Sequence, residues 1–282
     1  MRNKELMYKR LLMVVSTFLI IIIIICFTVI AIGRSHRNEL EQKYSTIEKQ
    51  YKDLDKKYID LDKKYKEIEK KRMIRNDNKK KKIINLTFDD GPSENTLEVL
   101  ATLKKNNVKA TFFVINTPED QIYKDIVAQG HKIGLHSYSH DYEKIYKNNK
   151  AFMKDINKLR NKVYKLTGVK SDIFRFPGGS SNTIVSNKVF NEIKRSTRDA
   201  GLEYYDWNCD STDASGSKIS VKNIVKNSSQ CINLNSINLL MHDGVGHKNT
   251  AKAVQDVIDF YQSKGYVFEA ISEGTPLVHH KD

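Results

Sequence analysis

Cysteine, phosphate-binding loops and a basic folded region are scarce or absent in this sequence of 282 residues. Three cysteines are too few for a disulfide-stabilised scaffold or a cysteine-based zinc module. Neither GxGxxG nor GxxxxGKS/T occurs, which argues against dinucleotide and nucleoside-triphosphate chemistry. Residues 1–82 carry 22 basic and 11 acidic side chains, whereas residues 83–282 carry 26 and 23. Because a nucleic-acid-binding domain is strongly basic in its folded part, we expect no nucleic-acid partner.

Residues 11–33 form a hydrophobic segment. From Leu11 to Ile32 no charge interrupts 22 positions, and a helix of that length reaches about 33 Å, enough to cross a bilayer core. A cleaved signal peptide is the alternative, although its apolar region covers only about 7–15 residues. The positive-inside rule places residues 1–10 in the cytoplasm and everything after residue 33 outside. We therefore predict a single-pass protein of the cell membrane whose folded domain is extracellular. The basic residues before the segment are Arg2, Lys4, Lys9 and Arg10.

Residues 34–82 follow as a helical stalk that ends in a basic linker, Lys79–Lys82. Apolar and aromatic residues recur in alternating steps of four and three, the 3.5-residue period of a coiled coil. In a parallel homodimer, Lys57 would face Asp62 and Lys64 would face Glu69 of the other chain. Tyrosine in the core of every heptad weakens such packing, because each hydroxyl needs a polar partner. A weak homodimer and a solitary spacer helix are both open. The repeat comprises Leu40, Tyr44, Ile47, Tyr51, Leu54, Tyr58, Leu61, Tyr65 and Ile68.

Residues 83–282 alternate short apolar segments with amphipathic stretches, which predicts an α/β fold with a parallel sheet. Seven strands could close as a barrel or lie open as a doubly wound sheet. In both folds, functional residues gather at the carboxyl ends of the strands. Strands are expected at 83–88, 108–114, 132–136, 173–176, 202–210, 237–241 and 266–271, and helices near 94–107, 120–129, 148–167, 186–200, 219–230 and 250–264.

Polar motifs end five of these expected strands. They read TFDDGP (87–92), HSYSH (136–140), RFPGG (175–179), DSTD (210–213) and LLMHD (239–243). Two histidines four residues apart share one face of a helical turn and can hold one metal ion together with a carboxylate. Such a ligand set leaves positions open for water and substrate, as in a catalytic site.

Taken in order, the five motifs resemble those of the polysaccharide deacetylases, carbohydrate esterase family 4, over residues 83–282. The resemblance implies a distorted (β/α)7-type barrel and metal-dependent removal of N-acetyl, sometimes O-acetyl, groups from sugars. It implies that Asp90, His136 and His140 hold one divalent ion. These ligands suit zinc, and cobalt, nickel or manganese could also enter.

The resemblance also implies the catalytic residues. Asp89 is similar to the general base, held ionised by Arg175, and His242 to the general acid, tuned by Asp213. These residue types suit amide hydrolysis, because a carboxylate can take a proton from water and an imidazolium can protonate the departing amine. Leu240 matches a wall of the acetyl pocket.

Two positions depart from the family pattern. Ala214 stands where a tryptophan often follows the fourth-motif aspartate, and Trp207 is the only candidate to replace it. Gly178 stands where an aromatic residue often precedes the last glycine of the third motif, and its backbone N–H could stabilise the oxyanion. Neither change removes a metal ligand, the base or the acid, so we expect an active enzyme.

The expected compartment narrows the substrate. A stalked domain outside a membrane meets a cell wall or a surface glycan, and the resemblance favours N-acetylglucosamine of peptidoglycan. Poly-N-acetylglucosamine, chitin and acetylated xylan are alternatives, and a non-catalytic wall-binding protein is the alternative from another class. Cys209 and Cys231 are the only cysteines after the membrane segment, and the sequence leaves open whether they form a disulfide or remain apolar thiols.

Overall fold

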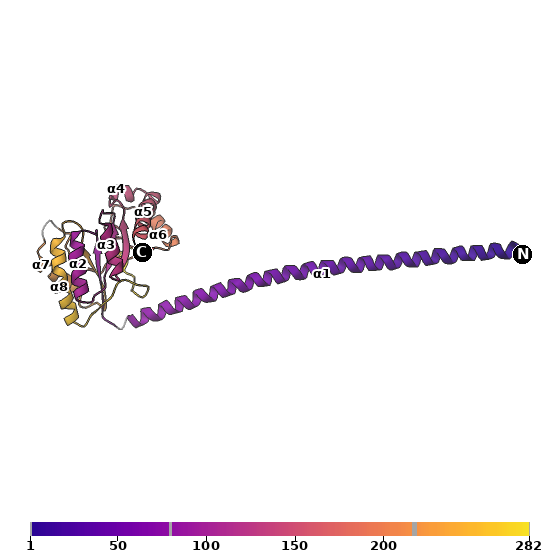
Figure 1. Cartoon of the computed structure of the whole chain (residues 1–282), viewed down its shortest axis with the longest axis horizontal. Helices are drawn as coiled ribbons and strands as arrows, with labels where there is room; N and C mark the ends of the chain where they lie inside the picture. Colours follow the sequence, from indigo (N-terminus) through magenta and orange to yellow (C-terminus); the bar gives the residue numbers. More distant parts are fainter. Residues whose placement is uncertain (1, 79–80, 216–218, 282) are drawn as a thin grey trace. The chain divides into compact units, whose positions relative to one another are not determined.

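The computed structural model describes residues 2–78, 81–215 and 219–281, which divide into two units that meet between Glu69 and Lys70. α1 (Arg2–Asn78) makes up the first unit, continues past its boundary, and runs without interruption through the predicted anchor and stalk (Figure 1). Its described part from Leu12 onward is long and apolar enough to cross a membrane. Lys79 and Lys80 of the predicted linker lie outside the described residues.

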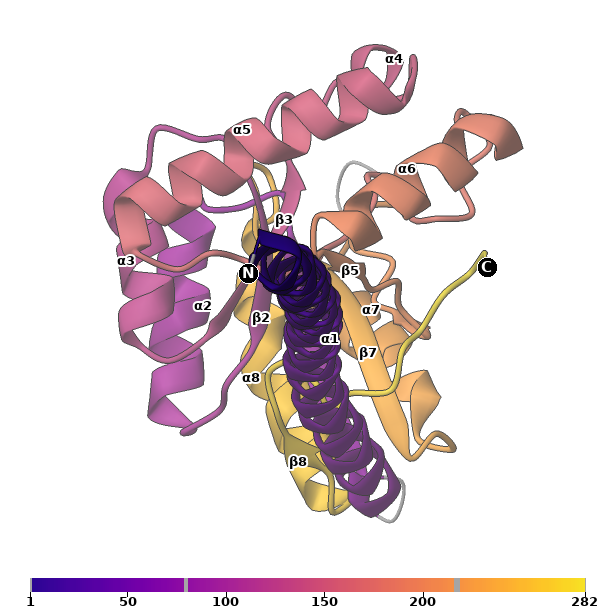
Figure 2. The same cartoon turned by 90° about the vertical axis from the view of Figure 1, so that its right-hand side faces the viewer.

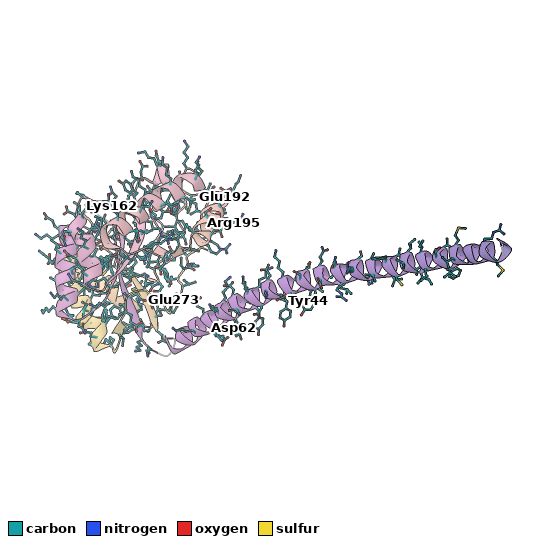
Figure 3. The ribbon with its side chains drawn as sticks, turned by 45° about the vertical axis from the view of Figure 1, so that its right-hand side comes forward. Tyr44, Asp62, Lys162, Glu192, Arg195 and Glu273 are labelled. Carbon is teal, nitrogen blue, oxygen red and sulfur yellow. A yellow bond between two sulfur atoms is a disulfide. The ribbon has the colours of Figure 1, made fainter. Side chains whose placement is uncertain are left out.

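The stalk portion of α1 exposes the predicted heptad residues. Tyr44 and Tyr51 are each 73% exposed, and Tyr44 and Asp62 project from the helix in Figure 3. Two of the charged residues expected to pair between chains pair instead within this helix. Lys64 Nζ lies 2.8 Å from Asp60, and Asp62 lies 2.8 Å from Lys66 Nζ. The dimer stays a prediction, because a single chain does not test it.

The second unit is built on one parallel sheet. The strand order is β5-β4-β3-β2-β1-β7-β6, and β8 pairs with the first two residues of β1. The central strand β1 is buried along its whole length, as expected for an apolar strand covered on both faces. The strands are β1 (Ile83–Asp89), β2 (Thr111–Ile115), β3 (Lys132–Ser137), β4 (Ile173–Phe174), β5 (Glu203–Tyr204), β6 (Cys209–Asp210), β7 (Ser236–His242) and β8 (Val267–Phe268).

Helices cover the outer face of the curled sheet (Figure 2). Helices in contact follow the order α7, α8, α2, α3, α5 and α6 around it. Side-chain caps begin several of them, including Ser93 before α2 and Asn148 before α5. This arrangement is an incomplete (β/α) barrel, which confirms the predicted fold class. The helices are α2 (Glu94–Lys105), α3 (Asp120–Ala128), α4 (Tyr142–Ile145), α5 (Asn149–Thr167), α6 (Asn187–Asp199), α7 (Val221–Ser228), the 3-10 helix η1 (Ser229–Cys231) and α8 (Lys248–Ser263).

Two hydrophobic clusters fill this unit, one on each face of the sheet. The larger packs the outer face against the helices. The smaller, inside the curl, consists of Phe113, Ile173, Tyr205 and Ile271. Arg175 is fully buried beside it, with its guanidinium carbon 4.3 Å from the centre of the Phe113 ring. A buried charge is costly unless it is paired and hydrogen-bonded, so the partners of Arg175 decide how the inside of the barrel is built.

The single strand expected at 202–210 is wrong, because the structure divides it. β5 pairs with β4 at one edge of the sheet, and β6 pairs with β7 at the other. The intervening backbone bonds elsewhere: Arg175 donates to the carbonyls of Tyr205 at 2.8 Å and Asp206 at 3.2 Å, and Asp206 N–H donates to the Val278 carbonyl at 2.8 Å. The hydrogen bonds of Arg175 thus occupy backbone carbonyls that a continuous strand would use to pair with its neighbours in the sheet.

The sequence left open whether Cys209 and Cys231 form a disulfide, and in the structure they do. Cys209 of β6 and Cys231 of η1 are joined, with an S–S distance of 2.07 Å. The bond fastens the edge strand β6 to the segment that follows α7. Cys26 is a free, exposed cysteine of α1.

Candidate active site

The polar motifs meet at the carboxyl edge of the sheet. β1 and β7 are adjacent and parallel, and their last residues, Asp89 and His242, are paired in register. β3 ends with His136 and Ser137, and Arg175 directly follows β4. Carboxyl ends of parallel strands lie at the same edge of a sheet, which is where α/β enzymes place their sites.

Asp90, His136 and His140 form a cluster whose ligand atoms lie within 4.8 Å of one another. Asp90 Oδ1 is 3.2 Å from His140 Nε2 and 3.5 Å from His136 Nε2. Among the described residues this buried oxygen has no hydrogen-bond partner. A buried polar atom without a partner is costly, and two imidazoles with one carboxylate are a ligand set for a catalytic divalent ion. The three residues therefore fit a metal ion.

The protonation of His136 is set by its surroundings. Its Nδ1 lies 2.9 Å from the carbonyl oxygen of Arg175. We assign the ring proton to Nδ1, because a carbonyl can only accept, and this leaves the Nε2 lone pair facing Asp90. Burial lowers the pKa of His136 to about 3 even though the nearby Asp90 raises it. The ring is therefore neutral, as a metal ligand must be.

The loop that carries His140 is fastened by an aspartate of α5. Asp155 accepts hydrogen bonds from Ser137 Oγ at 2.7 Å, from the Tyr138 N–H at 2.6 Å and from the Ser139 N–H at 3.0 Å. Ser137 Oγ in turn accepts the His140 N–H at 2.9 Å. His140 has φ 51°, a left-handed conformation that is uncommon outside glycine. These bonds hold the strained turn in place.

Asp89 and Arg175 form a buried ion pair. Arg175 Nη1 donates to Asp89 Oδ1 at 2.9 Å and to Thr87 Oγ1 at 2.8 Å. Burial raises the pKa of the Asp89 carboxyl, and the charge of Arg175 counteracts that rise. The second oxygen, Oδ2, lies 3.8 Å from His136 Nε2, on the side of the proposed metal ligands.

His242 is held by Asp213 through both its ring and its backbone. Asp213 accepts from His242 Nδ1 at 2.7 Å, from the His242 N–H at 2.7 Å and from Thr250 Oγ1 at 2.8 Å. Burial lowers the pKa of His242, but the bond and charge of Asp213, with Asp89 and Asp90, outweigh it and raise the pKa to about 9. His242 is therefore charged at neutral pH.

The turn between β1 and α2 is packed closely against the motif after β7. Asp243 is buried, and its Oδ2 accepts a hydrogen bond from Thr96 at 2.6 Å. A Cβ at Gly91 would lie 2.4 Å from Asp243 Oδ1, so only glycine fits there. The Asp243 N–H donates to the Asp89 carbonyl at 3.1 Å. The two motifs that carry Asp89 and His242 are thereby fixed to each other.

The remaining expected site residues lie around this centre. Leu240 is buried in β7, two residues before His242. Trp207 is partly buried and packs on the RFPGG loop, where a Cβ at Gly179 would lie 2.8 Å from its ring. Gly178 has φ 76° and faces the ring of Tyr142, and Ala214 is exposed. Trp207 lies beside Arg175, with 5.8 Å between the guanidinium carbon and the ring centre.

Three residues that support the site were not identified in the sequence. Asp155 lies in mid-helix, 15 residues after His140, where nothing marks it. Thr250 and His247 follow the fifth motif, and the His247 ring stacks on His242 with 5.1 Å between centres. A histidine five residues after the motif histidine His242 could have drawn attention, whereas the contacts of Asp155 arise only from folding.

The chain is similar to known proteins. The family model described as polysaccharide deacetylase matches residues 76–198. A peptidoglycan-N-acetylglucosamine deacetylase of Bacillus cereus is 32% identical over 210 residues, which cover 71% of this chain and 72% of that protein. A bifunctional xylanase/deacetylase of Pseudobutyrivibrio xylanivorans is 32% identical over 200 residues, covering 69% of this chain and 31% of that protein.

A solved structure is similar as well. The catalytic domain of a peptidoglycan N-acetylglucosamine deacetylase from Eubacterium rectale superposes with a TM-score of 0.68 at 37% identity. The match covers 71% of this chain and 93% of that domain. The similarity therefore extends through the unit that holds the site.

Proposed function

Because the chain belongs to the polysaccharide deacetylase family, we propose that it hydrolyses N-acetyl groups of peptidoglycan N-acetylglucosamine. The observation that carries this proposal is the pairing of two opposite proton-transfer groups. Asp89, held by Arg175, and His242, held by Asp213, end neighbouring strands in register beside the Asp90–His136–His140 cluster.

The metal would be held by Asp90, His136 and His140, and zinc suits this ligand set best. When bound, the ion would supply Lewis acidity that polarises the acetyl carbonyl and the attacking water. All other steps fall to side chains of this chain. Asp89 Oδ2 lies close to His136, which supports a role for Asp89 as a base beside the proposed metal ligands.

Asp89 acts as the general base. Arg175 occupies its Oδ1, so Oδ2 is the oxygen that accepts the proton of the attacking water. The water oxygen then bonds to the acetyl carbon and gives a tetrahedral oxyanion. The backbone N–H of Gly178 donates to that oxyanion, while Leu240 and Trp207 line the pocket for the methyl group.

His242 acts as the general acid. Its Nδ1 is engaged by Asp213, which leaves Nε2 to protonate the amine nitrogen as the carbon–nitrogen bond breaks. The products are acetate and a free amine on the sugar. A raised pKa suits this task, because the ring must carry its proton until the amine departs.

The substrate and compartment follow from the relatives and the anchor. Two of the similar proteins are named for peptidoglycan N-acetylglucosamine, while another joins a deacetylase to a xylanase. We place the amino terminus in the cytoplasm and the catalytic unit outside, on the charge bias around the apolar segment. The complete set of proton-transfer and ligand residues favours an enzyme over a silent wall-binding protein.

Acetate release by the full-length protein in detergent, loaded with zinc, tests the proposal. We expect release from peptidoglycan, and a loss of about 100-fold or more in kcat with Asp89→Asn. Zinc content should be unchanged in that variant. Asp256→Asn, at an exposed aspartate of α8, is the matched control and should keep full activity. Faster release from chitin or acetylated xylan would contradict the substrate, and no release from any glycan would favour the wall-binding alternative.

A further inference from the structure

A lysine-rich surface borders the site. Residues 142–170 carry nine lysines and arginines against two acids, whereas the rest of residues 83–282 carries 17 against 21. The net charge of residues 83–282 is therefore small, but one segment, which comprises α4 and α5, is strongly basic. We call Lys147, Lys150, Lys154 and Lys158 the basic face.

The basic face has little compensation from its surroundings. Lys147, Lys150 and Lys154 are exposed, and none of them forms an ion pair with any residue that the structure describes. The ion pairs of this segment belong to other lysines, in Lys144–Asp141 and Lys162–Asp120. The neighbouring helix α6 adds Lys188, Lys194, Arg195 and Arg198 against Glu192 and Asp199. Lys162 of α5, and Glu192 and Arg195 of α6, are labelled in Figure 3.

The basic face adjoins the loop that carries His140. Lys158 Nζ lies 3.9 Å from the centre of the Tyr138 ring, inside the HSYSH motif. Asp155, between Lys154 and Lys158, bonds to the same loop. α4 approaches from the other side, with the Tyr142 ring 5.4 Å from that of His140. A polymer whose acetyl group reaches the site must therefore pass close to these lysines.

We propose that the basic face binds carboxylates of the substrate polymer, so that the enzyme prefers an acetylated glycan bearing carboxylate groups to a neutral one. This rests on the proposed function and assigns the surface that would hold its substrate. Unsubstituted chitin and poly-N-acetylglucosamine carry no anion that the lysines could bind. The face consists of lysines, while Arg160 donates to the Ala200 carbonyl, so an anion would be held there by the point charges of ammonium groups and not by a bidentate arginine fork.

A membrane surface is the other polyanion that these lysines could meet. A lipid surface seated on them would cover the rim beside His140, where the substrate has to enter. The substrate polymer has no such conflict, because it would have to reach the same loop that the basic face adjoins. The interaction should weaken with salt, since exposed charges are screened.

The test compares chitohexaose with its carboxymethylated derivative, which adds carboxylate groups to the same acetylated backbone. Wild-type full-length protein should show a kcat/KM about tenfold higher on the carboxymethylated probe at low salt. Lys147→Gln/Lys150→Gln/Lys154→Gln should abolish that preference and leave kcat/KM on chitohexaose within about twofold. The matched control, Lys104→Gln/Lys105→Gln/Lys252→Gln, neutralises three exposed lysines of α2 and α8 and should keep the preference.

Binding separates this proposal from the activity. In the Asp89→Asn protein, calorimetry should find the carboxymethylated probe bound about tenfold more tightly, with the difference lost in the triple variant. If no glycan is hydrolysed but this difference in binding persists, the proposed function fails while the basic face stands. Equal affinity for the two probes, or an equal loss in the control triple, would overturn the inference. The inference would also be overturned if the protein bound anionic phospholipid vesicles through these lysines and had equal affinity for the two glycan probes.

Discussion

The proposed ligand residues are positioned by Asp155, a side chain outside the Asp90–His136–His140 cluster. Both carboxylate oxygens of Asp155 accept hydrogen bonds, three in all, from residues 137–139. Ser137 Oγ in turn accepts a hydrogen bond from the His140 N–H. His140 and Asp90 both have positive φ, at 51° and 70°. Such conformations persist only when surrounding contacts hold them. The geometry of the ligand set therefore depends on α5 as well as on the strand ends.

Removing these hydrogen bonds should weaken metal binding without unfolding the protein. We expect Asp155→Ala to lower zinc affinity about tenfold, the usual scale for residues that orient metal ligands, and Asp155→Asn to lower it less, because its amide oxygen still accepts. Competition with a chelator measures the affinity. Asn157→Ala, at an exposed neighbour on the same helix, is the control. An unchanged zinc affinity in Asp155→Ala would show that residues 137–140 keep their conformation without Asp155.

The proton of His242 should depend on Asp213. Because Asp213 raises the pKa of His242 to about 9, the acid is fully protonated below that pH and activity should decline as pH rises through it. In Asp213→Asn the stabilising charge is lost while burial remains, so the descending limb of kcat/KM should move to lower pH by more than one unit. A pH–rate profile of both proteins checks this. An unshifted limb would mean that another group donates the proton.

Elements with a strong local pattern were predictable from the sequence, and those shaped by distant contacts were not. The observed β1, β3 and β7 lie within one residue of their expected bounds, because they are apolar runs closed by polar motifs. The break between β5 and β6 was missed, since it depends on Arg175, about 30 residues earlier in the chain. The motif residues were found by type and spacing, and the structure brings them together. Asp155 belongs to no motif and becomes visible only when α5 packs on β3.

The disulfide at the edge of the sheet should stabilise the catalytic unit. It joins residues 22 positions apart, and closing a loop of that size contributes about 3 kcal/mol in the chain-entropy account. We expect Cys231→Ala to lower the free energy of unfolding by about that amount in urea titrations, with zinc binding retained. Thiol counting on the unreduced, unfolded protein is the check. One reactive thiol, from Cys26, is expected, and three would exclude the bond.

At the scale of the whole molecule, the stalk exposes an apolar stripe along the part of α1 that the structure describes. Tyr44, Leu54 and Tyr65 are each more than 60% exposed in one chain. We predict a weak parallel dimer that depends on anchoring, because confinement in one bilayer raises the local concentration. Cysteine substituted at Leu54 should cross-link in membranes, and cysteine at Asp53, which lies outside the stripe, should not. Equal cross-linking at both positions, or at neither, would favour a solitary spacer.

The contacts of residues 278–281 have a consequence for biosynthesis. Val278 receives the Asp206 N–H, His280 N–H donates to the Asp206 carboxylate, and Lys281 N–H donates to Ser180 Oγ. Asp206 in turn offers its carbonyl to Arg175, which holds Asp89. These residues leave the ribosome after every motif residue. In a nascent chain the three proposed ligand residues therefore emerge early, but the hydrogen bonds that support Arg175 and Asp89 are completed only when residue 281 has emerged.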